Sequence, residues 1–417
     1  MTITIHKPES AFNGTIHLPS SKSISNRALA INALAGQYGS LPDNVSDCDD
    51  TRVMINWLQA MPPLIDIGAA GTAMRFSSAL LAVTDGTRVI TGSERMRHRP
   101  ISVLVDALRQ LGAEVDYIGE EGFPPLRITG NSSLQGGELL LPGNVSSQYI
   151  SALLMIGPVL KQGLILHLDG DIISRPYIDL TLKVMSDFGA KVGWDDDRTI
   201  SVAPQGYTPT TYQVESDWSA ASYWYEIVAL SPDFKVCLPL MFANSYQGDS
   251  EVAHIFKFLG VKTEHTIDAT GAPCVVISKT TFKTERFDYD FVNQPDLAQT
   301  LAVTCCMMGI PFRFSGLQSL RIKETDRIAA LERELAKLGY HVTHQGDSIM
   351  EWDGSKQDFA SLESIDTYED HRMAMAFAPC ALCLPHISIN NPQVVSKSYP
   401  HFWDDLRKAG FTICEKP

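Results

Sequence analysis

The sequence Pro-Ser-Ser-Lys-Ser-Ile-Ser-Asn-Arg-Ala-Leu-Ala, residues 19–30, runs from a polar cluster into an apolar stretch of helical composition. Serine side chains cap the free N–H groups of a first helical turn, so this stretch predicts a helix start. A polar cluster followed by an Ala/Leu/Met-rich stretch recurs six times, at Ser23, Thr72, Ser147, Ser219, Asp296 and His371. The intervals of 49, 75, 72, 77 and 75 residues indicate an internal repeat.

A second repeated pattern, an apolar residue followed by glycine, marks the end of another helix in each repeat. Glycine is favoured directly after a helix, and the alternating residues that follow it predict a strand. The pattern occurs at Leu111-Gly112, Phe188-Gly189, Leu259-Gly260, Leu338-Gly339 and Ala409-Gly410. The first repeat lacks it, because residues 57–61 run directly into Pro62-Pro63. Its 49-residue interval predicts that roughly 25 residues, about two strands, are missing there.

Six repeats of helix, strand, helix and strands predict an α/β fold of two domains with three repeats each. The crossing is expected near residues 215–217, between the third and fourth repeats. We therefore expect an N-terminal domain of residues 20–216, with a shortened first repeat, and a C-terminal domain of residues 217–417. The periodicity alone leaves residues 1–19 unassigned. The six polar helix starts are expected to converge on one interdomain cleft.

The composition excludes several classes of partner. The formal net charge of −14 argues against nucleic acid. No apolar run reaches the roughly 18–20 residues of a membrane span, and the strand-like N-terminus lacks a signal-peptide core, so no membrane partner and a cytoplasmic location are expected. The eight cysteines, among them Cys305-Cys306 and Cys380-x-x-Cys383, lack a histidine at zinc spacing and are interpreted as core residues.

Basic residues occupy several of the predicted helix starts, namely Lys22, Arg27, Lys323, Arg327 and Arg372. A helix N-terminus already carries about half a positive charge, so a cation there costs about 0.3–1 kcal/mol. The recurrence of such cations predicts bound anions between the helix dipoles and the side chains. The alternative, exposed basic residues on ordinary helix starts, stays open for any single case. In a chain that is acidic overall, these basic clusters favour a site for small, multiply charged anions.

Further residue types suit an anion site with acid–base chemistry. Ser146-Ser147-Gln148 offers hydroxyl and amide groups at a helix start, a usual phosphate cradle, with simple capping as the alternative. Ser174 opens the next helix and is a candidate to complete that cradle. Of the three arginines at positions 95, 97 and 99, one is expected to be functional. Asp296, Glu324 and His371 are the acid–base candidates, although capping alone would also explain Asp296.

Five segments together resemble the 5-enolpyruvylshikimate-3-phosphate synthases, the 3-phosphoshikimate 1-carboxyvinyltransferases. They are residues 18–27, 70–75, 145–148, 321–327 and 370–374, in order along nearly the whole chain. The resemblance implies two domains of three βαβαββ units, with helix N-termini facing an interdomain cleft and residues 1–19 in the C-terminal domain. It also implies transfer of the enolpyruvyl group of phosphoenolpyruvate to the 5-hydroxyl of shikimate 3-phosphate in aromatic amino acid biosynthesis. The reaction releases phosphate by addition and elimination through a tetrahedral intermediate, without metal or cofactor.

Carried over residue by residue, the resemblance implies catalytic roles for Lys22, Asp296, Glu324 and His371. Asp296 would take the proton of the 5-hydroxyl group, and Glu324 would deliver a proton to the methylene carbon. Shikimate 3-phosphate would contact Lys22, Ser23, Arg27, Ser146, Ser147, Gln148, Ser174, Asp296, Ser319 and Lys323. Phosphoenolpyruvate would contact Lys22, Gly71, Arg99, Gln148, Arg327, Arg372 and Lys397. A monomer is expected.

The chain departs from the family pattern at four positions. Ala69 and Phe76 stand where the family usually has Asn and Pro, Ser319 replaces an Asn, and Glu369 replaces the Asn before Asp-His-Arg. We expect these changes to affect affinities more than the reaction. One alternative is a UDP-N-acetylglucosamine enolpyruvyl transferase, although the Ser146–Gln148 segment suits a compact phosphate better than a nucleotide sugar. The other is a non-catalytic anion-binding protein, against which the retained acid–base residues count.

Overall fold

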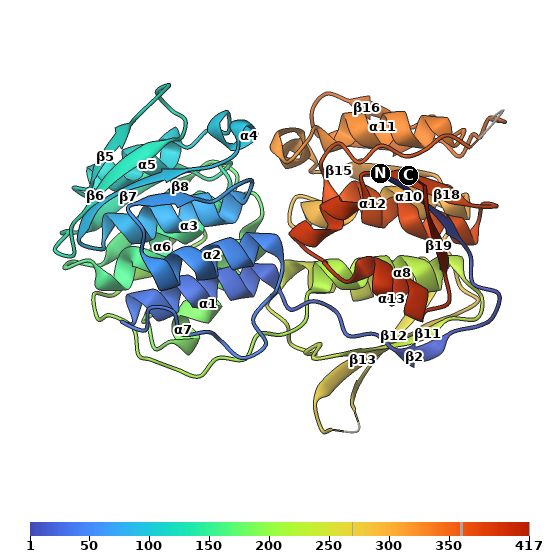
Figure 1. Ribbon diagram of the computed structural model, residues 1–417, viewed down its shortest axis with the longest axis horizontal. Coiled ribbons are helices and arrows are strands. Elements are labelled where there is room, and N and C mark those ends of the chain that lie inside the picture. Colours follow the sequence, from blue (N-terminus) through green and yellow to red (C-terminus); the bar gives the residue numbers. More distant parts are fainter. Residues whose placement is uncertain (269, 359–361, 417) are drawn as a thin grey trace. The chain divides into compact units, whose positions relative to one another are not determined.

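The computed structural model describes residues 1–268, 270–358 and 362–416. The chain divides into two compact units (Figure 1). Unit 1 comprises Met1–Pro19 and the chain from Glu215 onward, and unit 2 comprises Ser20–Val214. The observed boundary follows Val214, whereas the boundary expected from the sequence follows residue 216, two residues further along the chain. In the described part of the chain, no helix combines the length and the apolar character needed to cross a lipid bilayer.

Unit 2 contains two four-stranded sheets and the helices that pack on them. Its elements are α1 (Lys22–Leu34), α2 (Asp49–Ala60), β3 (Leu64–Asp66), α3 (Gly71–Ala82), β4 (Gly86–Thr91), α4 (Glu94–Arg97), α5 (Ser102–Gln110), β5 (Glu114–Tyr117), β6 (Leu126–Gly130), β7 (Gly137–Pro142), α6 (Ser147–Ile156), η1 (Gly157–Val159), β8 (Leu164–Asp169), α7 (Arg175–Asp187), β9 (Val192–Trp194) and β10 (Thr199–Val202). The strand orders are β3-β4-β6-β5 and β7-β8-β10-β9, and only the first pair of each sheet is parallel. The two sheets therefore share one strand order and one pattern of parallel and antiparallel pairs.

The first repeat of unit 2 is the short one. Residues 20–63, all of which the structure describes, hold α1 and α2 and no strand. The helix α2 ends at Met61, which takes a left-handed conformation with φ of 44°. In the other five repeats a glycine with φ between 81° and 94° stands two or three residues after the last residue of the second helix (Gly112, Gly189, Gly260, Gly339 and Gly410). The glycine signal thus marks the helix ends that it predicts.

Unit 1 contains two more four-stranded sheets and one three-stranded sheet. Its elements are β1 (Thr2–His6), β2 (Asn13–Thr15), α8 (Trp218–Leu230), β11 (Lys235–Pro239), η2 (Gly248–Glu251), α9 (Val252–Lys257), β12 (Val261–Ile267), β13 (Pro273–Lys279), β14 (Phe287–Asp290), η3 (Pro295–Leu297), α10 (Ala298–Met308), β15 (Phe312–Ser315), η4 (Gln318–Ile322), α11 (Arg327–Lys337), β16 (Thr343–Gln345), β17 (Ile349–Trp352), α12 (His371–Phe377), η5 (Ala378–Leu382), β18 (Ile387–Asn390), η6 (Pro392–Lys397), α13 (Phe402–Lys408) and β19 (Thr412–Lys416).

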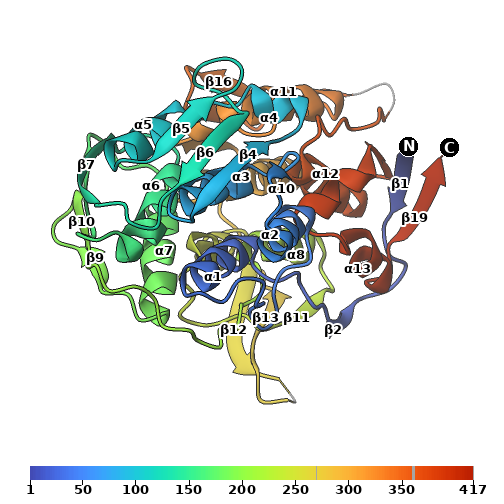
Figure 2. The ribbon, with the colours of Figure 1, turned by 60° about the vertical axis from the view of Figure 1, so that its left-hand side comes forward.

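The N-terminal strands complete sheets of unit 1. The strand β1 lies between β18 and β19 and is antiparallel to both, and Ile365 forms a parallel bridge with Ile389 of β18. This arrangement repeats the strand order of the four-stranded sheets, with β1 supplying the fourth strand. The strand β2 pairs in parallel with β11 at the edge of the sheet β12-β13-β11-β2. The strands β1 and β19, one at each end of the chain, lie side by side as a result (Figure 2).

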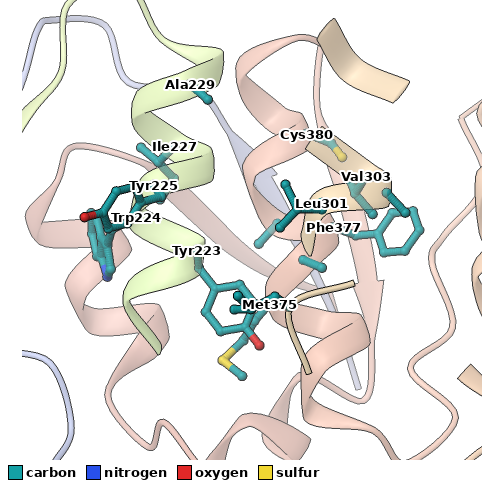
Figure 3. Packing of buried hydrophobic residues seen from close by; sticks show 14 of the residues in the cluster. Tyr223, Trp224, Tyr225, Ile227, Ala229, Leu301, Val303, Met375, Phe377 and Cys380 are labelled. Atoms are coloured by element: carbon teal, nitrogen blue, oxygen red, sulfur yellow. The ribbon is translucent and has the colours of Figure 1, made fainter. Parts of the chain in front are cut away.

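Helices that carry the polar clusters form the centre of each unit. In unit 1, α10 packs against both α8 and α12, and Tyr223, Leu301 and Met375 come together between them (Figure 3). In unit 2, α6 packs against α3 and α7, and α1 contacts α3, α6 and α7. A helix that is apolar on all sides is suited to such a central place. The first turns of these helices, which hold many of the candidate site residues, are therefore attached to the buried core of each unit.

Candidate functional site

The first turn of α1 supplies Lys22 and Ser23. The Ser21 hydroxyl caps the helix by accepting the Ile24 backbone N–H at 3.4 Å. Lys22 Nζ donates to Asp50 Oδ2 at 3.1 Å, and Asp50 is buried in the first turn of α2. A carboxylate from the chain itself therefore lies against this cation. The helix dipole at Lys22 predicts an external anion, whereas the partner in the structure is Asp50, which stands 28 residues away in the sequence.

Arg27 is buried among polar groups of three helices. Its Nε donates to Thr181 Oγ1 at 2.7 Å, and its two terminal nitrogens donate to the Ser23 carbonyl, the Ser151 hydroxyl and the Tyr177 carbonyl. Burial lowers its pKa to about 10, so the guanidinium stays charged at neutral pH. Its Cζ lies 5.3 Å from the centre of the Phe76 ring, a cation–π contact. Phe76, which the sequence marked only as a departure, thus lines the Arg27 site.

The starts of α3 and α6 are connected to each other. Gln148 Nε2 donates to the Thr72 hydroxyl at 3.1 Å, and the Ser146 hydroxyl accepts the Gln148 backbone N–H at 3.4 Å. Gly71 opens α3 against the Arg99 guanidinium, because a Cβ added there would lie 2.6 Å from Arg99 Nη1. The absent side chain is what allows this close approach. Arg99 is half-buried, whereas Arg95 and Arg97 are exposed, and Arg99 is the member of the basic run beside a candidate residue.

Ser174 stands at the N-cap of α7 in a left-handed conformation with φ of 56°, and it is buried. Its hydroxyl makes no capping bond, so simple capping does not explain it. Ser147 is half-buried in the first turn of α6. Apart from Arg27, one turn further along α1, and Arg99, between α4 and α5, the predicted residues of unit 2 therefore stand at the caps or first turns of α1, α3, α6 and α7. Side-chain bonds tie α1 to α6 and α7, and α6 to α3.

In unit 1 the candidate residues are organised around one buried guanidinium, that of Arg327. Its Nε donates to Asp370 Oδ2 at 2.7 Å, its Nη1 to Asp296 Oδ1 at 2.9 Å and its Nη2 to Glu324 Oε2 at 3.0 Å. Burial lowers the pKa of Arg327, but the three carboxylates outweigh it and raise the pKa above the usual value. Asp370 was not among the predicted site residues, and it is fully buried.

Asp296 receives cations from three sides. Besides Arg327, Arg372 Nη2 donates to its Oδ2 at 3.0 Å, and Lys323 Nζ lies 3.5 Å from its Oδ1. Burial acts to raise the pKa of Asp296, but the charges of Arg372, Lys323 and Arg327 hold that pKa well below the usual range. Asp296 is therefore an ionised carboxylate at neutral pH, held in place by groups that also suit anionic ligands.

Glu324 is the second carboxylate shared between cations. It accepts from Arg327 at 3.0 Å and from Lys397 Nζ at 2.8 Å, the latter from the end of η6. Asp296 and Glu324 are thus both attached to Arg327, each with a further cation of its own. Two groups predicted to move protons are brought to one centre in unit 1, which suits a reaction that takes a proton from one substrate and gives a proton to another.

The start of α12 is strained and buried. Asp370 caps the helix by accepting the Arg372 backbone N–H at 2.9 Å, and its Oδ1 lies 3.7 Å from His371 Nδ1. Tyr368 and Glu369 just before it have φ of 51° and 57°, a region that costs a residue other than glycine about 1 kcal/mol or more. Asn tolerates this conformation better than Glu does. The Asn that the family usually has before Asp-His-Arg would therefore fit this backbone with less strain.

One prediction needs correction. The sequence places Lys323 and Arg327 at one helix start, but α11 begins at Arg327 with Asp326 as its cap, and Lys323 lies between η4 and that helix. Lys323 is therefore not in the first turn of a helix, and the repulsion between a cation and the helix dipole does not apply to it in the way that the sequence suggested. Carboxylates of the chain pair with Arg327 and Arg372, so an anionic ligand at either guanidinium would share it with them. Ser319 is half-buried in η4, beside these residues in the chain.

Metal binding has no support in the arrangement of side chains. Within residues 1–268, 270–358 and 362–416, no three His, Cys, Asp or Glu side chains are grouped so that they could hold an ion. The cysteines are free, and Cys305, Cys306 and Cys380 are buried in the core of unit 1.

The sequence matches a protein family over nearly its whole length. The model of EPSP synthase (3-phosphoshikimate 1-carboxyvinyltransferase) covers residues 6–65 and 61–406. The chain belongs to the EPSP synthase family. It is 59% identical over 404 residues to a 3-phosphoshikimate 1-carboxyvinyltransferase of Bacteroides fragilis, with 97% of each chain covered. A protein of the same name from Yersinia pestis is 36% identical over 430 residues, covering 96% of this chain and 97% of that one.

Solved structures of an EPSP synthase and of another enolpyruvyl transferase have a fold similar to that of this chain. An EPSP synthase from Acinetobacter baumannii is similar with a TM-score of 0.78 at 23% identity, covering 99% of this chain and 100% of that one. The enolpyruvyl transferase NikO from Streptomyces tendae has a TM-score of 0.72 at 15% identity, covering 100% and 98%. The predicted α/β enolpyruvyl transferase fold is thereby confirmed.

Proposed function

We propose that this chain transfers the enolpyruvyl group of phosphoenolpyruvate to the 5-hydroxyl group of shikimate 3-phosphate and releases phosphate. Membership of the EPSP synthase family supports the reaction. The observation that carries the assignment of roles is the attachment of both Asp296 and Glu324 to the buried Arg327 guanidinium. Addition of an alcohol across the double bond of an enol phosphate needs one group that removes a proton and one that supplies a proton.

In the addition step, we propose that Asp296 accepts the proton of the 5-hydroxyl group as its oxygen attacks the central carbon of phosphoenolpyruvate. Glu324 supplies a proton to the methylene carbon, which becomes a methyl group in the tetrahedral intermediate. In the elimination step the methyl group loses a proton, and the C–O bond to phosphate breaks. Glu324 is suited to take that proton back, because the same geometry serves the reaction in both directions.

The cations of unit 1 suit the anionic groups of phosphoenolpyruvate. Arg327, Arg372 and Lys397 present guanidinium and ammonium donors that pair with carboxylates in this structure, and carboxylate and phosphate groups are the ligands that such donors prefer. We propose that substrate anions take over part of these contacts. When a cation turns to a substrate, its hold on Asp296 or Glu324 weakens, and the proton affinity of that carboxylate rises. Substrate binding would thus activate the base.

The residues of unit 2 suit shikimate 3-phosphate and the remainder of phosphoenolpyruvate. We propose that Lys22, Ser23, Arg27 and the Ser146–Gln148 segment bind the phosphate and ring hydroxyl groups, with Ser174 at the start of α7. Gly71 and Arg99 bind phosphoenolpyruvate, together with Lys22 and Gln148. In unit 1, Lys323 and Ser319 act on shikimate 3-phosphate, and His371 acts beside Asp370. All of these residues lie on one chain, so the reaction requires no second copy, and a monomer is proposed.

Phosphate release tests the proposal. Purified chain should release phosphate only when shikimate 3-phosphate and phosphoenolpyruvate are both present, and activity should survive treatment with a chelator. UDP-N-acetylglucosamine in place of shikimate 3-phosphate should give no release. Binding of both anions without turnover would favour the non-catalytic alternative, and turnover with the nucleotide sugar alone would contradict the assigned acceptor.

A further inference from the structure

A second buried carboxyl group, that of Asp249, lies in the neighbourhood of Asp296. Asp249 belongs to η2 and is 3% exposed. The Ser219 hydroxyl, in the first turn of α8, donates a hydrogen bond to Asp249 Oδ2. Its other oxygen, Oδ1, is buried without a hydrogen-bond partner among the described residues. A buried, half-satisfied carboxylate is unfavourable, and protonation is the simplest way to relieve it.

One face of α8 connects Asp249 with the proposed base. Ser219 and Tyr223 are four residues apart and therefore lie on the same side of the helix. Arg372 Nη1 donates to Tyr223 Oη at 3.4 Å, and Arg372 Nη2 donates to Asp296 Oδ2 at 3.0 Å. The helix α8 packs against both η2, which holds Asp249, and η3, which holds Asp296. The first two turns of α8 thus contact Asp249 through Ser219, and they contact Arg372, which pairs with Asp296, through Tyr223.

The protonation state of Asp249 depends on this arrangement. Burial, followed by the negative charge of Asp296, raises the pKa of Asp249 to about 7, while Arg372 and the Ser219 hydroxyl act in the opposite direction. Two carboxyl groups that interact this strongly titrate as a pair. Near neutral pH the pair therefore carries one proton in about half of the molecules, and that proton resides on Asp249.

The interaction between Asp249 and Asp296 bears on a chemical difficulty of the proposed mechanism. The cations that orient Asp296 also hold its pKa well below the usual range, which makes it a weak proton acceptor. We propose that Asp249 is a positioning residue that acts through Asp296, raising its affinity for the substrate proton when Asp249 itself is ionised. Asp249 takes no part in bond making: its proton leaves to solvent beforehand, and the hydroxyl proton goes to Asp296. This inference rests on the proposed role of Asp296.

Substitution of Asp249 leaves the other charged and titratable groups around it in place, so the effect of Asp249 on Asp296 can be measured separately. Asp217 caps α8 by accepting the Ala220 N–H at 3.1 Å, and its charge also raises the pKa of Asp249. The titratable side chains of the neighbouring helix α9, His254 and Lys257, are exposed. The groups that act on Asp249 from the packed elements are Asp296, Arg372, Ser219 and Asp217. None of the four is removed by substitution of Asp249 alone.

The test is the pH dependence of kcat/KM in Asp249→Asn and Ser219→Ala. Wild type should lose activity as pH falls through about 7, where Asp249 gains its proton. Asp249→Asn should move that acidic limb to lower pH and lower the plateau kcat by about tenfold, with both KM values changed by less than about threefold. Ser219→Ala should move the limb to higher pH, because a bond that stabilises the ionised Asp249 is lost. Asp233→Asn, exposed in the same unit, is the control.

Infrared spectroscopy supplies a readout that does not depend on activity or on the Asn variant. The carbonyl stretch of a protonated carboxyl group should disappear in wild type with a midpoint near pH 7. In Ser219→Ala that midpoint should rise. An acidic limb at the same pH in wild type and Asp249→Asn would overturn the proposal, as would the absence of a carbonyl band that titrates near neutral pH. Wild type without turnover would instead overturn the proposed function itself, whatever the infrared titration gives.

Discussion

Glu226→Gln should make the protein more stable at neutral pH. Glu226 lies on α8 between Tyr225 and Ile227, which belong to the unit 1 core (Figure 3), and its carboxyl group is fully buried. Burial raises its pKa well above the ordinary value of 4.5. The nearby Thr304 hydroxyl could offset this by donating to Glu226, but it donates to the Thr300 carbonyl at 2.7 Å instead. The folded protein therefore holds Glu226 protonated.

The size of the effect follows from proton linkage. Because the folded-state pKa is the higher one, the stability linked to this proton is complete below 4.5 and is lost as pH rises toward the folded pKa. Each pH unit above 4.5 costs about 1.4 kcal/mol for as long as the folded group stays protonated. Glutamine has nearly the same shape and no proton to lose. The gain in stability should therefore grow by about 1.4 kcal/mol per pH unit above pH 4.5 and level off once the pH reaches the folded-state pKa.

Urea unfolding of wild type and Glu226→Gln between about pH 5 and pH 8 measures this difference, with tryptophan fluorescence as the probe. Trp218 and Trp224 on the same helix report on the unit 1 core. Glu285→Gln, at an exposed position of unit 1, is the matched control and should show no pH-dependent gain. A difference between Glu226→Gln and wild type that is the same at both ends of the pH range would refute the reasoning. Such a result would mean that Glu226 is ionised in the folded core.

Three further predictions concern the site. Asp296→Asn and Glu324→Gln should each lower kcat by about 10²-fold or more with little change in substrate affinity, and near-normal turnover in either would remove its assigned role. Gly71→Ala places a methyl group 2.6 Å from Arg99 Nη1, so the guanidinium must shift, and the KM for phosphoenolpyruvate should rise more than that for shikimate 3-phosphate. Equal losses for both substrates would indicate a general distortion. Glu369→Gly relieves a left-handed φ of 57° and should stabilise the protein by about 0.5–1 kcal/mol, so destabilisation in urea would show that the Glu369 side chain contributes more than its backbone strain costs.

Local features of the fold were predictable because short-range chemistry determines them. Ser21 and Asp370 cap the helices whose starts they mark, and Gly339 takes the positive φ that its place after a helix requires. The same reasoning failed at Lys323, because capping by Asp326 starts α11 later than the basic run suggested. Capping rules describe a helix boundary only when the capping residue is recognised.

Long-range partners could not be read from the sequence. The carboxylate of Asp50 pairs with Lys22 across two helices, and that of Asp370 pairs with Arg327 from 43 residues away. Spacing along the chain carries no signal for such contacts, since they depend on how helices pack. The same holds for Asp249, which the motif pattern did not single out and which only the packing of α8 against η2 and η3 brings toward Asp296.

The most direct test of the account is a single reaction in heavy water, followed by NMR, with shikimate 3-phosphate, phosphoenolpyruvate and no added metal. If addition and elimination proceed through a methyl-bearing intermediate, phosphate and an enolpyruvyl ether of shikimate 3-phosphate should form in equal amounts, with deuterium in the vinyl methylene group. Asp296→Asn and Glu324→Gln should slow both products together. Phosphate release without the acceptor, or an enolpyruvyl product free of deuterium, would contradict the proposed reaction.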